Sequence, residues 1–276
     1  KLYSVYFDTP DLYLHQHAMA IRLRRVGRGW VQTLKGGGEV QAGLHLRNEW
    51  ETPVPSETLD FGALAACGAK SLPKQVRKAL QPIFVTDFTR TARLLNFAGA
   101  EIELSLDSGE IRADREVRQF AEVELELKSG APVQLFHLAL QLLEVVPLAL
   151  ENTSKAEYGY RMWMHAQAEI SRAEKRPINE DDQVASVLQS MIWSCLMHMQ
   201  ANVSGALDIV DDEYLHQMRV ALRRLRVALN MAYRVQPDTE LDGLRRDVAA
   251  LTAVLGRTRE WDVFVTQNLL PLRQQL

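Results

Sequence analysis

Apolar and polar residues alternate along most of the segment 1–165, which is typical of β-strands with one apolar and one polar face. In the segment 122–128, Glu122, Glu124 and Glu126 point to one face of a strand, while valine and leucine point to the other. Many such antiparallel strands predict a closed barrel or a sandwich. The pattern places strands at 2–8, 20–26, 30–37, 43–54, 83–97, 100–111 and 120–130, and helices at 61–69, 73–80 and 133–144.

The spacing of apolar residues changes to that of helices after residue 182. A polar, proline-containing stretch, 169–182, precedes this change and is predicted to be a linker. We therefore expect an α+β chain with a strand-rich domain over 1–168 and an all-α bundle over 183–276. Within the bundle the pattern predicts helices at 183–207, 212–234, 239–254 and 259–270.

Composition indicates the general class of protein but not its function. The chain has 276 residues, 47% of them hydrophobic and 24% charged, and a net charge of −3, which predicts a soluble globular protein. Cys67 and Cys195 belong to no metal or redox motif, so we expect a reducing, cytoplasmic setting. No stretch is apolar and long enough to span a bilayer, and the global charge indicates neither a nucleic-acid partner nor a membrane. The oligomeric state stays open.

Charged residues gather on one face of nearly every predicted strand. Two interpretations stay open at this point: a sandwich with wet charged faces, or a polar-lined barrel whose apolar residues face outward onto helices. Carboxylates two residues apart on a strand lie roughly 7 Å apart and repel by about 2 kcal/mol at an effective dielectric near 20. An enclosed face would therefore need cationic side chains or a bound metal to compensate its glutamates.

The motifs YFDTPD, IRLRR, TLKGG, RNEWE, EVELELKSG and SKAEYGY occur in an order that resembles the CYTH superfamily, the triphosphate tunnel metalloenzymes. The resemblance implies an eight-stranded antiparallel tunnel in which basic residues bind a triphosphate and glutamates hold Mg²⁺ or Mn²⁺. The corresponding phosphate-binding positions are Arg22, Arg24, Lys35, Arg47, Arg90 and Lys155. Glu124 and Glu126 correspond to metal ligands and Glu49 and Glu51 to tunnel-lining residues; Glu124, Glu126 and Lys35 are the implied catalytic set.

The sequence departs from this family at its beginning. The family's first strand carries a Glu-x-Glu-x-Lys motif, and no such strand precedes Lys1. The match at 124–128 comes after the other motifs, so it is the late strand. Either the natural protein carries the first strand ahead of residue 1, or the chain is a form with an incomplete metal site. We favour the first, which leaves seven strands of the tunnel in this sequence.

A basic stripe is predicted on the helix at 212–234. His216, Arg219, Arg223 and Arg226 follow steps of 3, 4 and 3 and share one helix face. No acidic residue lies between His216 and Arg234, which favours an anion ligand over a solvated face paired within the helix.

The motifs LMHMQANV, EYLHQMRVALRRLR and LGRTREWDV resemble the CHAD family of α-helical domains, which implies polyphosphate binding. The positions that carry this implication are His198, His216, Arg219, Arg223 and Arg226, with Arg257 and Arg259 as further basic residues. Together the resemblances predict a metal-dependent inorganic triphosphatase that cleaves tripolyphosphate to pyrophosphate and phosphate. The alternatives are hydrolysis of thiamine triphosphate or a nucleoside triphosphate, cyclisation of ATP, and a non-catalytic polyphosphate-binding module.

Overall fold

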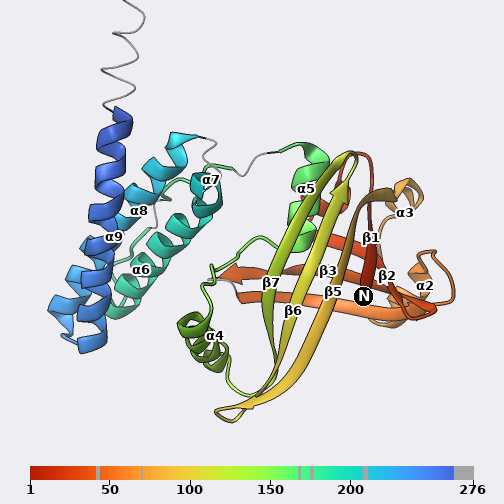
Figure 1. Cartoon of the computed structure of the whole chain (residues 1–276), viewed down its shortest axis with the longest axis horizontal. Coiled ribbons are helices and arrows are strands. Elements are labelled where there is room, and N and C mark those ends of the chain that lie inside the picture. Colours follow the sequence, from red (N-terminus) through yellow and green to blue (C-terminus); the bar gives the residue numbers. More distant parts are fainter. Residues whose placement is uncertain (42–43, 70, 167–168, 175–176, 208–210, 264–276) are drawn as a thin grey trace, which may run out of the picture. The chain divides into compact units, whose positions relative to one another are not determined.

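The chain divides into two compact units, Lys1–Ala166, which combines strands and helices, and Gln167–Leu276, which is helical in its described part (Figure 1). The computed structural model describes residues 1–41, 44–69, 71–166, 169–174, 177–207 and 211–263. None of the helices in these ranges is long and apolar enough to cross a lipid bilayer.

The first unit is built on one antiparallel sheet of seven strands in the order β4-β3-β2-β1-β5-β6-β7. This confirms the α+β class and the seven strands that the alternation predicts. β4 and β7 are the edges, and Leu44 at the start of β4 packs against the cluster of Ile102 and Leu138 near the β6–β7 end. The strands are β1 Leu2–Asp8, β2 Met19–Val26, β3 Gly29–Gln41, β4 Leu44–Val54, β5 Gln81–Phe97, β6 Ala100–Ala113 and β7 Glu116–Ser129.

The strand register places the predicted charged residues on one face of this sheet. Residues that pair across antiparallel strands point to the same side, and each strand from β4 to β7 pairs with its neighbour, with register shifts only at Tyr6/Phe7, Gly36/Gly38 and Glu101/Ile102. We call this side the concave face; it carries Ser4, Tyr6, Arg22, Arg24, Thr33, Lys35, Glu49, Glu51, Phe88, Arg90, Asp107, Glu122 and Glu124. Of the two interpretations of the alternation, the polar-lined one is therefore correct.

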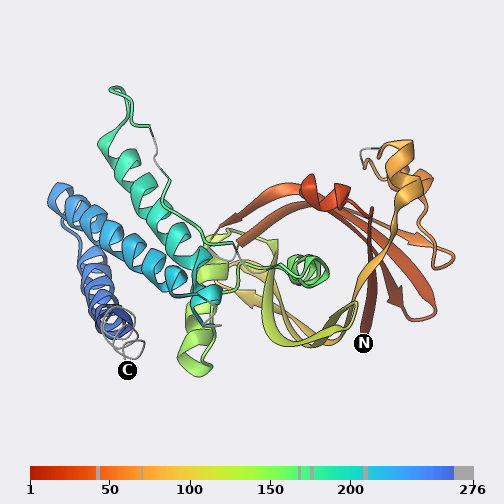
Figure 2. The same ribbon diagram turned by 90° about the horizontal axis from the view of Figure 1, so that it is seen from above.

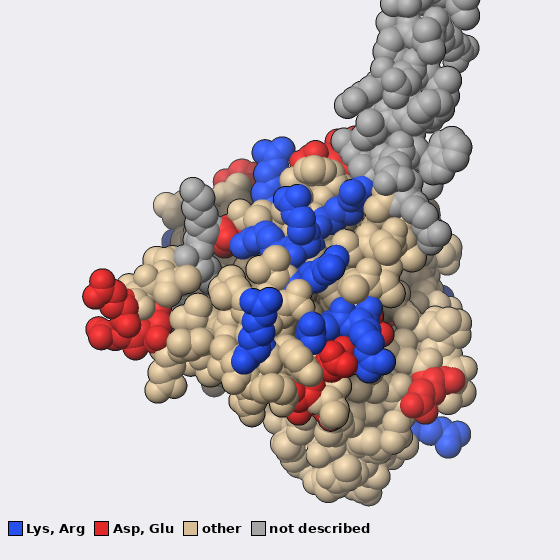
Figure 3. Space-filling model, turned by 90° about the vertical axis from the view of Figure 1, so that its left-hand side faces the viewer, with Lys and Arg blue, Asp and Glu red and all other residues tan. Residues whose placement is uncertain are grey.

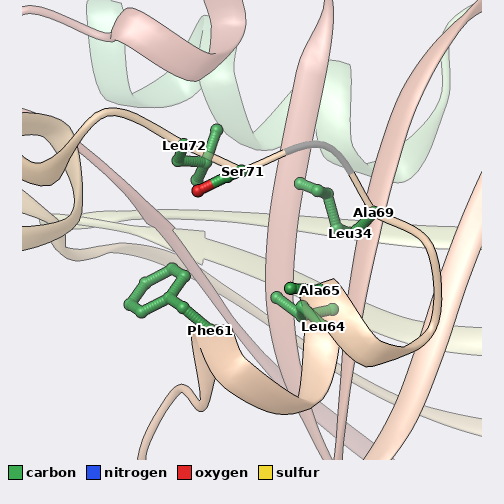
Figure 4. Close-up of a pocket in the computed structure, with 7 residues that line it drawn as sticks. All are labelled: Leu34, Phe61, Leu64, Ala65, Ala69, Ser71 and Leu72. Atoms are coloured by element: carbon green, nitrogen blue, oxygen red, sulfur yellow. The ribbon is translucent and has the colours of Figure 1, made fainter.

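Short helices cover the opposite, apolar face. Ile21 and Leu34 pack there with Leu64, Leu72 and other residues of the chain between β4 and β5, and α4 covers Ile102 and the leucines of β7. A small pocket between β3, helix α2 (Phe61–Ala66) and the residues that follow this helix is lined by apolar side chains and Ser71, with no charged group (Figure 4). The helices of this face are α1 Tyr13–Gln16, α2 Phe61–Ala66, α3 Lys74–Ala79 and α4 Val133–Val145.

One helix, α5 (Lys155–Met164), lies on the concave face, where the sheet curves around it (Figure 2). Tyr160 of α5 packs in a cluster with Tyr6 and Phe84 of the sheet. Gly159 makes this contact possible, because a Cβ atom there would lie 2.3 Å from the Phe84 ring. α5 therefore closes one end of the charged face and brings its own first residues into it.

The second unit is helical, as predicted, with corrections at two boundaries. The predicted helix 183–207 ends at Asn202, whose buried side chain bonds to Ser171 and to the His198 carbonyl, so part of the predicted linker is tied to this unit. The predicted helices 239–254 and 259–270 begin as one helix that continues through Gly256; residues beyond 263 lie outside the described part. One interior glycine costs about 1 kcal/mol, too little to end a long packed helix. The helices are α6 Val184–Ala201, α7 Val203–Leu207, α8 Asp212–Val235 and α9 Thr239–Val263, around a core of Cys195, Leu222, Leu225 and Leu229.

Candidate active site

Three carboxylates meet near the middle of β6 and β7. Asp107 pairs directly with Glu122 in the register, Glu124 follows two residues later, and one oxygen of each lies within 4.8 Å of the others. The Asp107 side chain is fully buried, whereas Glu122 and Glu124 are partly exposed. Hard divalent cations prefer such oxygen ligands, so this donor set fits a divalent metal ion.

Two cations neutralise these carboxylates. Arg90 of β5 makes a bidentate pair with Asp107, with both N···O distances 2.7 Å, and also contacts Glu124. Lys155 Nζ lies 2.8 Å from Asp107 and 2.6 Å from Glu124, and it also contacts Glu122. Ser154 caps α5 by accepting from the backbone N–H of Glu157, which fixes Lys155 as the first residue of the helix. Lys155 therefore reaches the carboxylates from a rigid element.

The electrostatics of the group differ between the two glutamates. Burial raises the pKa of Glu122 to about 7, against the opposing effect of Lys155. Burial acts in the same direction on Glu124, but Lys155 and Arg90 outweigh it and lower the pKa of that carboxyl. For Lys155, burial by itself lowers the pKa, and Glu124 and Glu122 more than reverse this, so the pKa is raised. The carboxylates thus keep the side chain of Lys155 protonated, while the carboxyl of Glu122 has a pKa near neutrality.

The other half of the concave face carries two arginines from β2 that are not paired with its carboxylates in the part of the chain that the structure describes. Arg22 is buried and donates to Thr33 and to the Tyr6 hydroxyl, both at 3.4 Å, while Arg24 donates to Ser4 at 3.1 Å. Burial, together with the nearby charges of Arg22 and Arg90, lowers the pKa of Arg24 to about 10. Among the described residues, these arginines donate hydrogen bonds only to neutral groups, so their charge is available to an anion.

Two family models match the chain. A model of the CYTH domain matches residues 1–160, which is more than half of the sequence. The chain belongs to the CYTH family. A model of the CHAD domain matches residues 190–275, so a CHAD match follows the CYTH match, as the motifs predict.

A curated relative of this CYTH chain is the inorganic triphosphatase of Haemophilus influenzae, 35% identical over 157 residues. The match covers 57% of this chain but only 44% of that protein, so the chain spans less than half of the relative's length. Two solved structures overlap weakly. A candidate adenylyl cyclase from Hippeastrum with a dominant triphosphatase activity is 14% identical, with TM-score 0.38, and covers 58% of this chain and 81% of its own. A candidate adenylate cyclase from Bacillus halodurans is 15% identical, with TM-score 0.34, and covers 56% and 79%.

Some predicted CYTH site residues lie apart from the three carboxylates. Lys35 pairs with Glu49 across β3 and β4, and Glu51 accepts from Thr33 at 3.1 Å. Glu126, predicted to be a metal ligand, has a side chain that is 60% exposed and pairs with Lys128 at 2.7 Å. It is not part of the Asp107–Glu122–Glu124 group, because it lies two residues beyond Glu124 on the same face, so its metal role stays a prediction. The side chain of Arg47 lies outside the described part of the structure.

Asp107 belongs to this group of carboxylates but was not predicted from the sequence. It shares the strand parity of Glu103 and Ser105, so the alternation of β6 places it on the charged face. That signal was available in the segment 100–111. What the sequence could not supply is the register, which sets Asp107 against Glu122 and Arg90 at once.

The basic stripe of the CHAD-like unit is present on α8. Arg223 and Arg226 are exposed, whereas Arg219 donates to the carbonyls of Leu255 and Gly256 at 3.3 Å. His216 is half-buried. In the view of Figure 3, which looks onto the helices of this unit, basic side chains gather close to one another.

His198 lies apart from this stripe in its contacts. It is 5% exposed, and its Nε2 atom lies 3.1 Å from the Ser171 carbonyl and 3.2 Å from Gln217 Oε1. Burial lowers the pKa of His198, so the neutral ring is favoured. In this arrangement the ring packs within the unit, and its predicted contact with polyphosphate would require a rearrangement. Arg257 and Arg259 have side chains outside the described part.

Proposed function

We propose that this chain hydrolyses inorganic triphosphate on the concave face with Mg²⁺ or Mn²⁺, and that its helical unit binds polyphosphate. The observation that carries the proposal is the group of Asp107, Glu122 and Glu124 held against Arg90 and Lys155 on one curved face. A cation site and a phosphate site adjoin there. The name of the Haemophilus relative supports the choice of inorganic triphosphate among the CYTH substrates.

The basic residues of the face suit a linear triphosphate. Arginine presents a planar fork that matches phosphate oxygens, and lysine supplies a compact charge. Along the chain of phosphates, Arg22 and Arg24 would bind from β2, Lys35 from β3, and Arg90 and Lys155 from the acidic half. The side chain of Arg47 is a further predicted binder.

The carboxylates would hold the cation through Asp107, Glu122 and Glu124, with Glu126 as the predicted outer ligand. When bound, a divalent cation neutralises phosphate oxygens and makes a nearby water more acidic. Arg90 and Lys155 now balance the carboxylates that the cation would bind. Once a bound cation balances the charge of the carboxylates, the N–H groups of Arg90 and Lys155 would be free to bind the substrate.

Hydrolysis forms a bond from a water oxygen to a terminal phosphorus and breaks the bond from that phosphorus to the pyrophosphate oxygen. Negative charge builds on the pyrophosphate that leaves, so cations along its length stabilise the transition state. Lys155 and Arg90, which already contact the carboxylates, would stabilise this charge through their remaining N–H groups. The water's proton leaves to solvent or to the phosphate product.

The direct test measures phosphate release from tripolyphosphate with Mg²⁺, with Mn²⁺ and with EDTA. We expect turnover with a metal and none with EDTA, and a loss of at least a hundredfold in Glu124→Gln, since removing one such electrostatic group costs about 10²–10³ in rate. Glu144→Gln is the matched control, because Glu144 is an exposed carboxylate on α4. Tripolyphosphate binding without any phosphate release would favour the non-catalytic alternative. Parallel assays with thiamine triphosphate and ATP separate the other substrates.

The polyphosphate role of the helical unit has its own test. Arg223→Ala with Arg226→Ala removes two exposed guanidinium groups from the α8 stripe. We expect weaker binding of long-chain polyphosphate and unchanged tripolyphosphate hydrolysis. The control is Arg172→Ala with Arg246→Ala, two side chains that are 75% and 77% exposed outside the stripe. Equal affinity in the two double variants would reject the assignment.

A further inference from the structure

An aromatic ring occupies the centre of the concave face among the basic residues. Phe88 of β5 is 2% exposed, and three cations lie over its ring. The distances to the ring centroid are 6.0 Å from Arg24, 5.8 Å from Arg90 and 5.1 Å from Lys155. These cations come from β2, β5 and α5, so the ring is a contact that all three elements share.

A second ring extends this platform. Phe120 of β7 meets Phe88 edge to face, with the centroids 5.6 Å apart and the planes at 64°. Lys155 lies 5.4 Å from the Phe120 centroid, so its ammonium group has aromatic contacts besides its carboxylate partners. Edge-to-face pairs hold both rings in a defined orientation.

The backbone opposite Phe88 leaves no room for a side chain. Gly109 of β6 is the direct cross-strand partner of Phe88. A Cβ atom at Gly109 would lie 2.4 Å from the Cα and Cβ atoms of Phe88 and 2.3 Å from the Asp87 carbonyl oxygen. β5 and β6 thus approach closely beside the ring, and the same two strands bring Arg90 to Asp107 two residues further along.

The Phe88 ring offsets the repulsion between the cations of this face. Cations gathered for a triphosphate repel one another while no anion is present, and the lowered pKa of Arg24 reflects burial together with the charges of Arg22 and Arg90. The carboxylates partner Arg90 and Lys155, but within the described part of the chain Arg24 donates only to the neutral Ser4. The negative face of an aromatic ring attracts each cation without competing with phosphate for its N–H groups.

We propose that Phe88, supported by Phe120, is a positioning residue whose ring face holds Arg24, Arg90 and Lys155 together so that they converge on one triphosphate. This inference rests on the proposed function for its ligand. It differs from a packing role because it depends on the charge distribution of the ring rather than on its volume.

Fluorination of the ring separates these roles, because it withdraws the negative charge from the ring face with little change in shape. Phe88 is replaced by 4-fluoro-, 3,5-difluoro- and 3,4,5-trifluorophenylalanine in the full chain, and tripolyphosphate affinity is measured by calorimetry in EDTA. We expect affinity to fall with each added fluorine, about tenfold over the series, with an unchanged melting temperature. The control is the same series at Phe97, a partly buried residue that packs near α4.

Equal affinities across the Phe88 series, or the same decline at Phe97, would overturn the inference. A chain that binds tripolyphosphate with the expected decline but never cleaves it contradicts the proposed hydrolysis and leaves the aromatic platform intact. A chain that binds no tripolyphosphate in EDTA overturns the inference, and phosphate release with Mg²⁺ or Mn²⁺ then decides the proposed hydrolysis separately. Phe88→Leu adds a simpler comparison: affinity should fall at least as far as in the trifluoro variant, and parental affinity in a folded Phe88→Leu chain overturns the role.

Discussion

The concave face of the sheet and the basic stripe of α8 both contain several arginines, but the partners of these arginines differ between the two regions. On the concave face, Arg90 and Lys155 are locked onto buried or half-buried carboxylates. On α8, Arg219 donates to backbone carbonyls, and no carboxylate is paired with Arg223 or Arg226 among the described residues. A ligand of the first region must therefore exchange partners with an existing network, whereas a ligand of the second meets open charge.

This difference determines what each region can select. Exchange of partners in a partly buried network favours a ligand that replaces both signs, as a metal–triphosphate pair would do. Open charge on a helix surface attracts a polyanion of any length and is screened by salt. The first region is suited to chemistry on one small molecule and the second to retention of a long one.

The largest expected effect is that of Asp107→Asn, which keeps the shape of the residue and removes the charge that Arg90 and Lys155 share. Because the side chain is fully buried, we expect a loss of about 3–5 kcal/mol in the free energy of unfolding of the sheet unit, measured by denaturant titration. Arg223→Ala on α8 should cost less than about 0.5 kcal/mol. Similar losses in the two variants would remove the contrast between the regions.

Metal affinity should depend on pH through Glu122. Burial raises its pKa from 4.5 to about 7, so the metal-free fold favours the protonated form and loses that stabilisation as the pH rises through 7. Cation binding needs the carboxylate and runs in the opposite direction. We expect Mg²⁺ affinity to rise about tenfold per pH unit up to pH 7 and then level, with one proton released. Calorimetry in buffers of different ionisation enthalpy counts this proton, and Glu122→Gln should abolish the dependence.

Salt should separate the two anion sites. Raising NaCl from about 0.05 to 0.5 M shortens the Debye length from about 14 to 4 Å, which weakens contacts with exposed charge most. We expect long-chain polyphosphate binding to the helical unit to weaken about tenfold or more, and tripolyphosphate binding on the concave face to weaken less. Fluorescence anisotropy of labelled polyphosphate and calorimetry of tripolyphosphate give the two slopes. Parallel slopes would mean that both ligands meet the same kind of surface.

The smallest expected effects are on packing, and they have opposite signs in the two units. Gly159→Ala should destabilise the sheet unit by about 1–2 kcal/mol, since its Cβ would meet the buried Phe84 ring at 2.3 Å and overpacking outweighs the helix propensity of alanine. Gly243→Ala in α9 meets nothing within 4 Å and should stabilise the helical unit by about 0.5–1 kcal/mol. Calorimetric unfolding resolves the two. A stabilising Gly159→Ala would contradict the tight seat of α5 on the sheet.

Local pattern was sufficient for the strands, incomplete for the helices and insufficient for the site. The strands that form the sheet were predicted to within a few residues, because alternation is a property of neighbouring positions. Helix α5 was not predicted, although its capping signal, Ser154 followed by Glu157, was present in the sequence and places Lys155 at the start of the helix. The length of α9 was predicted wrongly, because Gly256 lowers helix propensity locally while packing on α8 sustains the helix.

The sequence by itself determined which residues share a face of each strand, the α+β class, and the inventory of arginines and carboxylates. Only the tertiary structure decided which strands are neighbours and in what register, and thereby brought Asp107 to Glu122, Arg90 to Asp107 and Phe88 beneath three cations. The physical reason is the separation along the chain of the residues that interact. Side-chain direction follows from adjacent backbone geometry, whereas the contacts of the site join residues far apart in the chain, whose pairing depends on the free energy of the whole sheet.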